Sequence, residues 1–277
     1  MLRNLAVHIT YQGTDFNGYQ IQPGEPRTVQ AELQTVLERL LRHAPRISCA
    51  GRTDAGVHAY AQVVNFQTEK DFPVDRLAPA LNSMLPGNVR AVQAWEMPAD
   101  FSARFSALAR HYRYILRPHE STQNPHLRNS IWQCRYDLDF ESLKQSWLSL
   151  QGQHNFQAFC KSGSYRDSYD ISVHWCHAWQ WQGFWVLEII AQSFLYNMVR
   201  NLVGTMVDIA RGKLPPEQLQ QALASGERQL SGSTAPPQGL YLYNVLYPAA
   251  LGLELLQPNL HNWPVPLADP DLKPDML

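Results

Sequence analysis

The chain has 277 residues, 45% of them hydrophobic, and a formal net charge of −1. This length suits a globular protein with a large core, divided into two units of ordinary size. The most apolar stretch, residues 185–210, holds three charged side chains (Glu188, Arg200 and Asp208), which argues against a membrane span. The N-terminus lacks the basic-then-apolar layout of a signal peptide, so we expect a cytoplasmic protein.

The first half of the chain predicts the order strand, helix, strands, helix, strand. The ranges are 4–11, 28–42, 46–66, 75–85 and 89–96. The first helix carries an apolar stripe at helical spacing. Its members are Val29, Leu33, Val36, Leu37 and Leu40. We expect the second helix to begin near Asp75, because Pro79 is tolerated only in an early turn.

The second half repeats this order. The ranges are a strand at 111–117, a helix at 140–150, strands at 172–180 and 185–192, a helix at 194–211 and a strand at 240–247. Gly212 suits the end of the last helix. Two successive β-α-β-β-α-β units predict an α+β fold of two ferredoxin-like subdomains with largely antiparallel sheets.

The expected boundaries are 1–105 for the first subdomain and 106–248 for the second. Residues 249–277 hold five prolines and predict an extended or disordered tail. The tail also carries four acids and one lysine, so the rest of the chain has 22 basic and 20 acidic side chains. The overall charge therefore does not predict nucleic-acid binding.

The four cysteines are scattered and form no C-x-x-C pair, which favours reduced thiols. They are Cys49, Cys134, Cys160 and Cys176. His174, Cys176 and His177 are residue types that bind metals, but side chains alternate between the two faces of an extended segment. We therefore expect no metal site there.

The segment C-A-G-R-T-D-A-G-V-H at residues 49–58 carries the strongest chemical signal. Gly51 and Gly56 permit a backbone path that side chains forbid, so the segment predicts a tight loop presenting Asp54 and Arg52. An aspartate held beside cations stays ionised and can act as a nucleophile or base. The alternative is an Asx-turn with a solvated arginine.

Residues 100–117 combine arginines with aromatic side chains, against a single acid. The arginines are Arg104, Arg110, Arg113 and Arg117. Cations for phosphates and rings for bases are what RNA binding needs. The alternative is that the aromatic residues pack in a core beside solvated arginines.

The motif G-R-T-D-A-G-V-H at residues 51–58 resembles the active-site signature of the TruA family of tRNA pseudouridine synthases. Similar segments follow in order: D-F-S-A-R-F-S-A at 100–107, R-H-Y-R-Y at 110–114, N-M-V-R-N-L-V-G at 197–204 and G-L-Y-L at 239–242. The similarity spans about residues 4–248. It implies an isomerase that converts uridine to pseudouridine in the anticodon stem-loop of tRNA, at tRNA positions 38, 39 and 40.

The resemblance also implies a homodimer whose two subdomains flank a central catalytic cleft. Asp54 would be the catalytic carboxylate, and Arg200 the cation that places it and lowers its pKa. Tyr112 would stack on the uracil, and its hydroxyl could help to remove the C5 proton. From the residues alone, Arg200 could equally be a solvated helix arginine, and Tyr112 a core tyrosine. No metal or redox cofactor is expected, because the reaction is an isomerisation.

Four further residues are expected to contact RNA. Arg52 would help to occupy the space left by the extruded nucleotide, or would bind a phosphate. Arg104 and Arg110 would contribute positive charge to the RNA-binding surface. His58 could contact RNA or make a structural hydrogen bond instead.

The chain departs from the family pattern at several positions. Gln12 and Tyr19 replace an acid and a tryptophan of the first motif. Ser168 and Asp170 stand where a threonine and an arginine are common, which argues against one RNA contact. Two other functions stay open. A non-catalytic RNA-binding module has little use for Asp54 in a phosphate-binding cleft, and a hydrolase of the N-glycosidase type would release free uracil.

Overall fold

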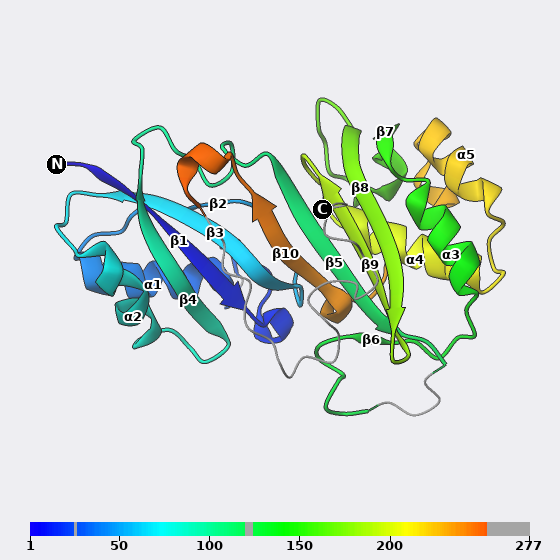
Figure 1. The fold of residues 1–277 in the computed structure, drawn as a ribbon, viewed down its shortest axis with the longest axis horizontal. Coiled ribbons are helices and arrows are strands. Elements are labelled where there is room, and N and C mark those ends of the chain that lie inside the picture. The colour runs from blue at the N-terminus through cyan, green and yellow to red at the C-terminus, as the bar shows by residue number, and fades with distance from the viewer. Residues whose placement is uncertain (25–26, 120–123, 254–277) are drawn as a thin grey trace.

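The computed structural model describes residues 1–24, 27–119 and 124–253 (Figure 1). Most of the expected tail, from residue 254 onward, lies outside the described residues. Its first residues form a short 3₁₀ turn, Ala249–Leu251. No helix of the described part of the chain is both long and apolar enough to cross a bilayer.

A ten-stranded sheet runs through the described part of the molecule in the order β4-β1-β3-β10-β5-β9-β8-β7, with β2 paired to β3 and β6 to β5. The strands are β1 Arg3–Tyr11, β2 Ser48–Cys49, β3 His58–Thr68, β4 Val89–Met97, β5 Ala109–Arg117, β6 Trp132–Gln133, β7 Gly152–Asn155, β8 Asp170–Trp181, β9 Phe184–Ala191 and β10 Leu240–Leu246. The helices are α1 Val29–Leu41, α2 Val74–Asn82, α3 Phe140–Leu148, α4 Met198–Ala210 and α5 Glu217–Ser225.

The sheet is mostly antiparallel, as expected. The exceptions are the pairs β10 with β3 and β5 with β6, which are parallel. Helices and a mixed sheet agree with the α+β prediction. The division into two ferredoxin-like subdomains at 1–105 and 106–248 stays a prediction, since the strands of both halves form one continuous sheet.

Strand β10 joins the two halves. It is late in the sequence but lies in the middle of the sheet, between β3 and β5 (Figure 1). Leu242 of β10 is in register with Ala59 of β3 on one side and with Tyr112 of β5 on the other. The strand that follows the signature loop and the strand that carries Tyr112 are therefore held one strand apart.

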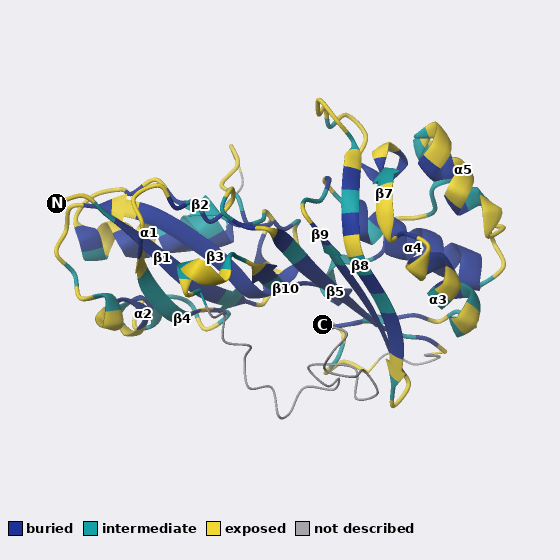
Figure 2. Ribbon diagram, turned by 45° about the horizontal axis from the view of Figure 1, so that its top comes forward, coloured by how far each residue is buried: buried dark blue, intermediate teal, exposed yellow. Residues whose placement is uncertain are grey.

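Side chains of the central strands alternate between two apolar clusters on opposite faces of the sheet. Tyr112, Tyr114 and Leu242 belong to the larger cluster, which includes the apolar faces of the helices. Ile115 and Tyr241 belong to a smaller cluster on the other face. Figure 2 shows the central strands buried along most of their length, and Figure 1 shows α1 behind β1 and β4 and α4 behind β8 and β9. Both faces at the centre are thus packed.

Helix α2 begins at Val74, one residue from the predicted start, and Pro79 lies beyond its first turn, where its nitrogen has no hydrogen to donate. The predicted start of the next long helix of the second half needs correction. Helix α4 begins at Met198 and not at residue 194, because Asn197 has a φ of 63°, in the left-handed region. Gly212, as predicted, lies just past the end of α4 with a φ of 71°.

Candidate active site

The signature loop leaves β2 and enters β3 through a tight turn at Asp54. The N–H of Val57 donates to the carbonyl oxygen of Asp54 at 3.1 Å. Gly56 has a φ of 78°, which favours glycine. A Cβ at Gly56 would also lie 2.8 Å from a ring carbon of Pro237. The loop therefore needs glycine at 56 for both its backbone path and its packing.

Residues 11–19 hold the loop from the N-terminal side. The N–H of Tyr19 donates to the carbonyl oxygen of Thr53 at 3.0 Å, and the hydroxyls of Tyr11 and Thr53 hydrogen-bond at 2.7 Å. The N–H of Gly56 donates to the carbonyl oxygen of Phe16 at 3.2 Å. Backbone atoms of this first motif, together with the Tyr11 hydroxyl, therefore hold the loop, and at Tyr19 the contact comes from its backbone N–H.

Asp54 forms an ion pair with Arg200 of α4. The Nη1 atom of Arg200 lies 3.3 Å from Oδ2 of Asp54, across 146 positions of sequence. The Asp54 and Arg200 side chains are 17% and 16% exposed, so most of the surface of the pair is shielded from solvent. Arg200 is itself oriented, because its Nε donates to the carbonyl oxygen of Ala235 at 2.9 Å and its Nη1 to Oδ1 of Asn197 at 3.4 Å.

The electrostatic balance at Asp54 differs from the expectation. Burial raises the pKa of the Asp54 carboxyl, and the positive charges of Arg200 and Lys161 offset this effect only in part. The net pKa lies above the ordinary value of an aspartate. Arg200 lowers the pKa of Asp54 as predicted, but the loss of hydration on burial outweighs this effect.

Tyr112 lies beside this pair on β5 and is only 7% exposed. Its hydroxyl would be 3.5 Å from a Cβ placed on Gly51, so it faces the start of the signature loop. Its ring packs edge-to-face on Phe194, with centroids 4.8 Å apart. Burial raises the pKa of Tyr112, and the nearby Asp54 carboxylate adds to this effect. The hydroxyl therefore stays protonated.

Residues 194–197 connect three parts of the site. Phe194 packs on Tyr112, and the carbonyl oxygen of Tyr196 accepts from the N–H of Lys161 at 2.9 Å. Asn197 contacts Arg200, as described above. Sequence reasoning assigned this stretch to a helix and missed Lys161 and Tyr196. Their only signal was a cation before a Ser-Gly-Ser turn and a tyrosine before the N-M-V-R motif.

His58 is buried, with 2% of its surface exposed. Its Nδ1 accepts a hydrogen bond from the N–H of Gly13 at 3.0 Å, and its ring stacks on Tyr241 with centroids 4.6 Å apart. Burial lowers the pKa of His58 to about 4. Of the two roles considered for His58, the structure contains the structural hydrogen bond. The buried ring is not exposed to RNA in this conformation.

The arginines expected to bind RNA have different environments. Arg110 donates to the carbonyl oxygens of Gln192 at 2.8 Å, of Ala50 at 3.0 Å and of Arg104, so it ties three segments together. Arg52 and Arg104 are exposed. The guanidinium of Arg104 lies 5.0 Å from the ring centroid of Phe105, which is itself 80% exposed. This cation and ring are open to solvent.

Arg113 lies outside the expected basic surface. It is 2% exposed and pairs with Glu188 at 2.8 Å. His111 and Trp179 also hydrogen-bond to the Glu188 carboxylate, at 3.1 and 2.9 Å. Burial would raise the pKa of Glu188, but Arg113 and these donors hold it at about 2. Arg113 is therefore buried in the core and is not part of the expected arginine-rich surface.

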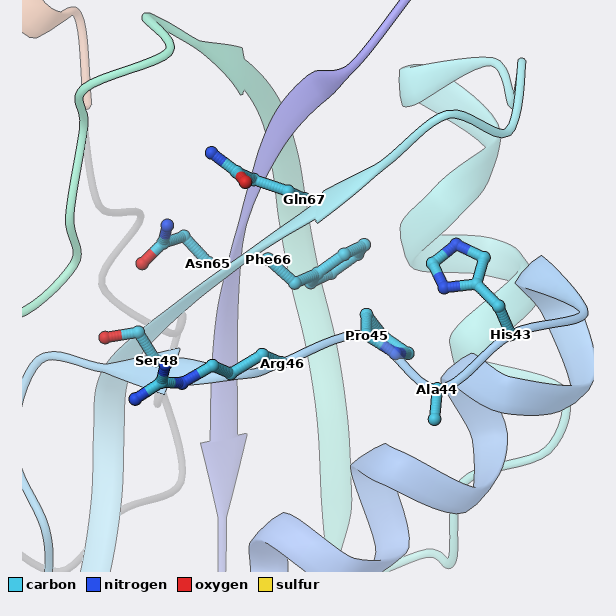
Figure 3. Close-up of a pocket in the computed structure, with 8 residues that line it drawn as sticks. All are labelled: His43, Ala44, Pro45, Arg46, Ser48, Asn65, Phe66 and Gln67. Carbon is cyan, nitrogen blue, oxygen red and sulfur yellow. The ribbon is translucent and has the colours of Figure 1, made fainter.

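A surface pocket of about 380 Å³ lies away from this site. Figure 3 shows its lining, which comes from the α1–β2 connection and the end of β3: His43, Ala44, Pro45, Arg46, Ser48, Asn65, Phe66 and Gln67. Asp54, Tyr112 and Arg200 take no part in it. In the described residues, no group of three or more His, Cys, Asp and Glu side chains could hold a metal ion.

The structure is an α+β protein whose mixed sheet carries Tyr112 on a central strand, beside the largely buried ion pair of Asp54 and Arg200. A family model described as tRNA pseudouridine synthase matches residues 7–106 and 148–248. The chain therefore belongs to the tRNA pseudouridine synthase family, as the motifs predicted. Members of this family isomerise uridine to pseudouridine in tRNA.

Curated relatives agree over most of the chain. The tRNA pseudouridine synthase A of Syntrophomonas wolfei is 39% identical over 248 residues, covering 89% of this chain and 98% of the relative. The same enzyme of Halalkalibacterium halodurans is 40% identical over 240 residues, covering 86% and 90%. Among solved structures, a chain from "Crystal Structure of a Cbf5-Nop10-Gar1 Complex" matches with a TM-score of 0.34 and 10% identity, covering 84% of this chain and 56% of that one.

Proposed function

We propose that this synthase acts on uridines of the tRNA anticodon stem-loop, with Asp54 as its catalytic carboxylate. The observation that supports this best is the contact of 3.3 Å between Arg200 and Asp54, next to Tyr112. These three residue types supply a carboxylate, a cation that orients it and a ring for the uracil. All three come from the motifs that resemble the TruA family.

Asp54 acts on a uridine that has been turned out of the RNA stack, which costs a few kcal/mol. Breaking the bond between N1 and C1′ frees the uracil, which turns and rejoins the sugar through C5. The carboxylate acts at the sugar or the base during this exchange, while Arg200 keeps it in place. Because bonds are only rearranged, the reaction needs no outside oxidant or reductant.

Tyr112 holds the freed uracil and assists the last proton transfer. Its ring lies on the same face of the sheet as the helix core, close to the signature loop. Because its hydroxyl is protonated, it serves as a hydrogen-bond donor to the uracil or relays the C5 proton to a second base. Arg52 is exposed and takes part of the space left by the uridine.

The RNA-binding surface includes Arg52, Arg104 and Phe105, which offer exposed cations and an exposed ring. Arg110 supports this surface by holding the backbone beneath it. We further propose a cytoplasmic homodimer, in which ferredoxin-like subdomains at 1–105 and 106–248 flank the catalytic cleft. Relatives named tRNA pseudouridine synthase A support tRNA as the substrate.

The test is to incubate the protein with unmodified tRNA, without added metal or cofactor, and to map pseudouridine at each position. Formation in the anticodon stem-loop supports the proposal. Free uracil and an abasic site would indicate a hydrolase instead. Tight tRNA binding without any product would indicate a non-catalytic RNA-binding module, and pseudouridine elsewhere in the tRNA would contradict the proposed target.

A further inference from the structure

A second pocket, of about 270 Å³, adjoins the candidate active site. Its lining comes from the loop after the 3₁₀ turn Gln157–Phe159 and from the end of α5: Gln157, Cys160, Lys161, Ser162, Gly163, Ser164, Tyr169, Gly226 and Arg228. The lining holds two cations and two serine hydroxyls and includes no carboxylate. The signature motifs do not account for this chemistry.

Lys161 connects the pocket to the site. Its Nζ lies 3.3 Å from the hydroxyl of Tyr196 and 4.5 Å from the centroid of that ring. Tyr196 directly precedes Asn197, which contacts Arg200. The charge of Lys161 also lowers the pKa of Asp54, which is consistent with a short separation between the two. These contacts place the pocket on the same side of the site as Asn197 and Arg200.

Arg228 is held in place by neutral oxygens. Its Nη1 donates to the carbonyl oxygen of Gly232 at 3.3 Å and its Nη2 to Oδ1 of Asn201 at 3.4 Å. Such partners orient a guanidinium without neutralising its charge. A guanidinium and an ammonium in one lining, together with two serine hydroxyls, match the requirements of a phosphate group.

We propose that this pocket binds a backbone phosphate of the substrate RNA, next to the target uridine. The inference rests on the proposed function, in which RNA is the substrate. Tyr196 is 48% exposed and offers its ring to a neighbouring base. Together the pocket and Tyr196 form a second RNA contact, contributed by the C-terminal half of the chain.

The test measures tRNA affinity against salt concentration for Lys161→Gln, Lys161→Arg and the unchanged protein, with an unmodified tRNA as the probe. One lost phosphate contact should lower the salt slope by about one and weaken binding several-fold at low salt. Lys161→Arg should keep most of both. Lys70→Gln is the matched control, because Lys70 is exposed and lies just beyond the C-terminal end of β3. The strand separates it by roughly 30 Å from His58, at the end of β3 nearest the signature loop.

A salt slope that Lys161→Gln leaves unchanged would overturn the inference, as would an equal change in Lys70→Gln. Arg228→Gln is a second test variant and should also lower the salt slope. Its thermal unfolding is measured first, to show that it is as stable as the unchanged protein. If the unchanged protein binds tRNA and forms no pseudouridine, the proposed function fails. The phosphate contact is then still decided by the slopes.

Discussion

Asp54 is subject to two opposing effects at the scale of a single residue. Burial disfavours its charge, and the guanidinium of Arg200 at 3.3 Å favours it. The first effect is the larger in the free protein. A carboxylate that has lost part of its hydration is more reactive toward a carbon centre or a proton, provided that a cation keeps it ionised.

Asp54→Asn should lower the rate of pseudouridine formation by roughly three orders of magnitude or more, because an amide cannot act as nucleophile or base. Affinity for tRNA should change little, since the proposed phosphate contacts lie elsewhere. Single-turnover rates and equilibrium binding measure the two quantities separately. An equal loss of rate and affinity would count against a catalytic role for Asp54.

Arg200→Gln should raise the pKa of Asp54 further, because it removes the largest favourable charge near the carboxylate. Activity needs the ionised form, so the acid limb of the pH–rate profile should move to higher pH. Arg200→Lys keeps the charge and should restore most of the original profile. The profile of kcat/KM measures this, and an unmoved limb in Arg200→Gln would show that Arg200 does not control Asp54.

At the scale of elements, the segment 231–237 binds along α4 and positions Arg200. The N–H of Gly232 donates to Oγ1 of Thr205 at 2.8 Å, and the hydroxyl of Thr234 donates to Oδ1 of Asn201 at 2.6 Å. The N–H of Ala235 donates to the carbonyl oxygen of Arg200 at 3.0 Å. The same segment then reaches the signature loop through Pro237. This segment therefore helps to fix the distance between Asp54 and Arg200.

Gly204→Ala should disturb this arrangement, because a Cβ at Gly204 would lie 1.6 Å from the carbonyl oxygen of Ser233. The segment must move, and Arg200 loses its fixed acceptor at Ala235. We expect kcat to fall by roughly a hundred-fold, with tRNA affinity preserved. Gly87→Ala is the control, since a Cβ there meets nothing within 4 Å. A parallel fall in kcat and affinity would indicate general unfolding.

Periodicity in the sequence predicted the long elements well. The stripe of α1 is buried as expected at Val29, Leu33, Val36 and Leu37, whereas Leu40 is half-buried and Leu41 is buried instead. Periodicity placed the start of α4 too early, because apolar spacing continues through residues 194–197, whereas the backbone is left-handed at Asn197. It missed α5, whose three buried residues are too few to give a stripe. Pro216 and Gly226 at its ends were the available signals.

The same limit applies to the site. Asp54, Tyr112 and Arg200 were predicted by motif, and the structure brings them together. The environment of Arg113 could not be read from its neighbours, because its partner Glu188 lies on β9, 75 positions away. Tyr112 and Arg113 are consecutive in a strand and so lie on opposite faces, but the sequence does not show which partner covers the face of Arg113.

At the scale of the molecule, His58 lies at the junction of the two halves. It is the first residue of β3, and its ring stacks on Tyr241 of β10. Its pKa of about 4 in the folded protein compares with 6.5 for an ordinary histidine. Between these values the unfolded chain binds a proton that the folded protein does not, so stability falls as the pH decreases.

His58→Asn should remove this pH dependence, because the amide oxygen can accept from Gly13 without titrating. Between pH 6.5 and 4 the parent should lose about 3 kcal/mol of unfolding free energy through this group. The variant should lose correspondingly less, because all other titratable groups act equally in both proteins. Urea unfolding across this pH range measures the difference, and identical pH profiles would contradict the assignment.

The position of β10 has a consequence for biosynthesis. Until the ribosome has delivered residues 240–246, the parts of β3 and β5 that pair with β10 lack this partner at the centre of the future sheet. The nascent chain therefore cannot join its two halves through β10 during most of translation. A premature stop codon before β10 should yield aggregation and no residual enzyme, however much of the signature region it leaves intact.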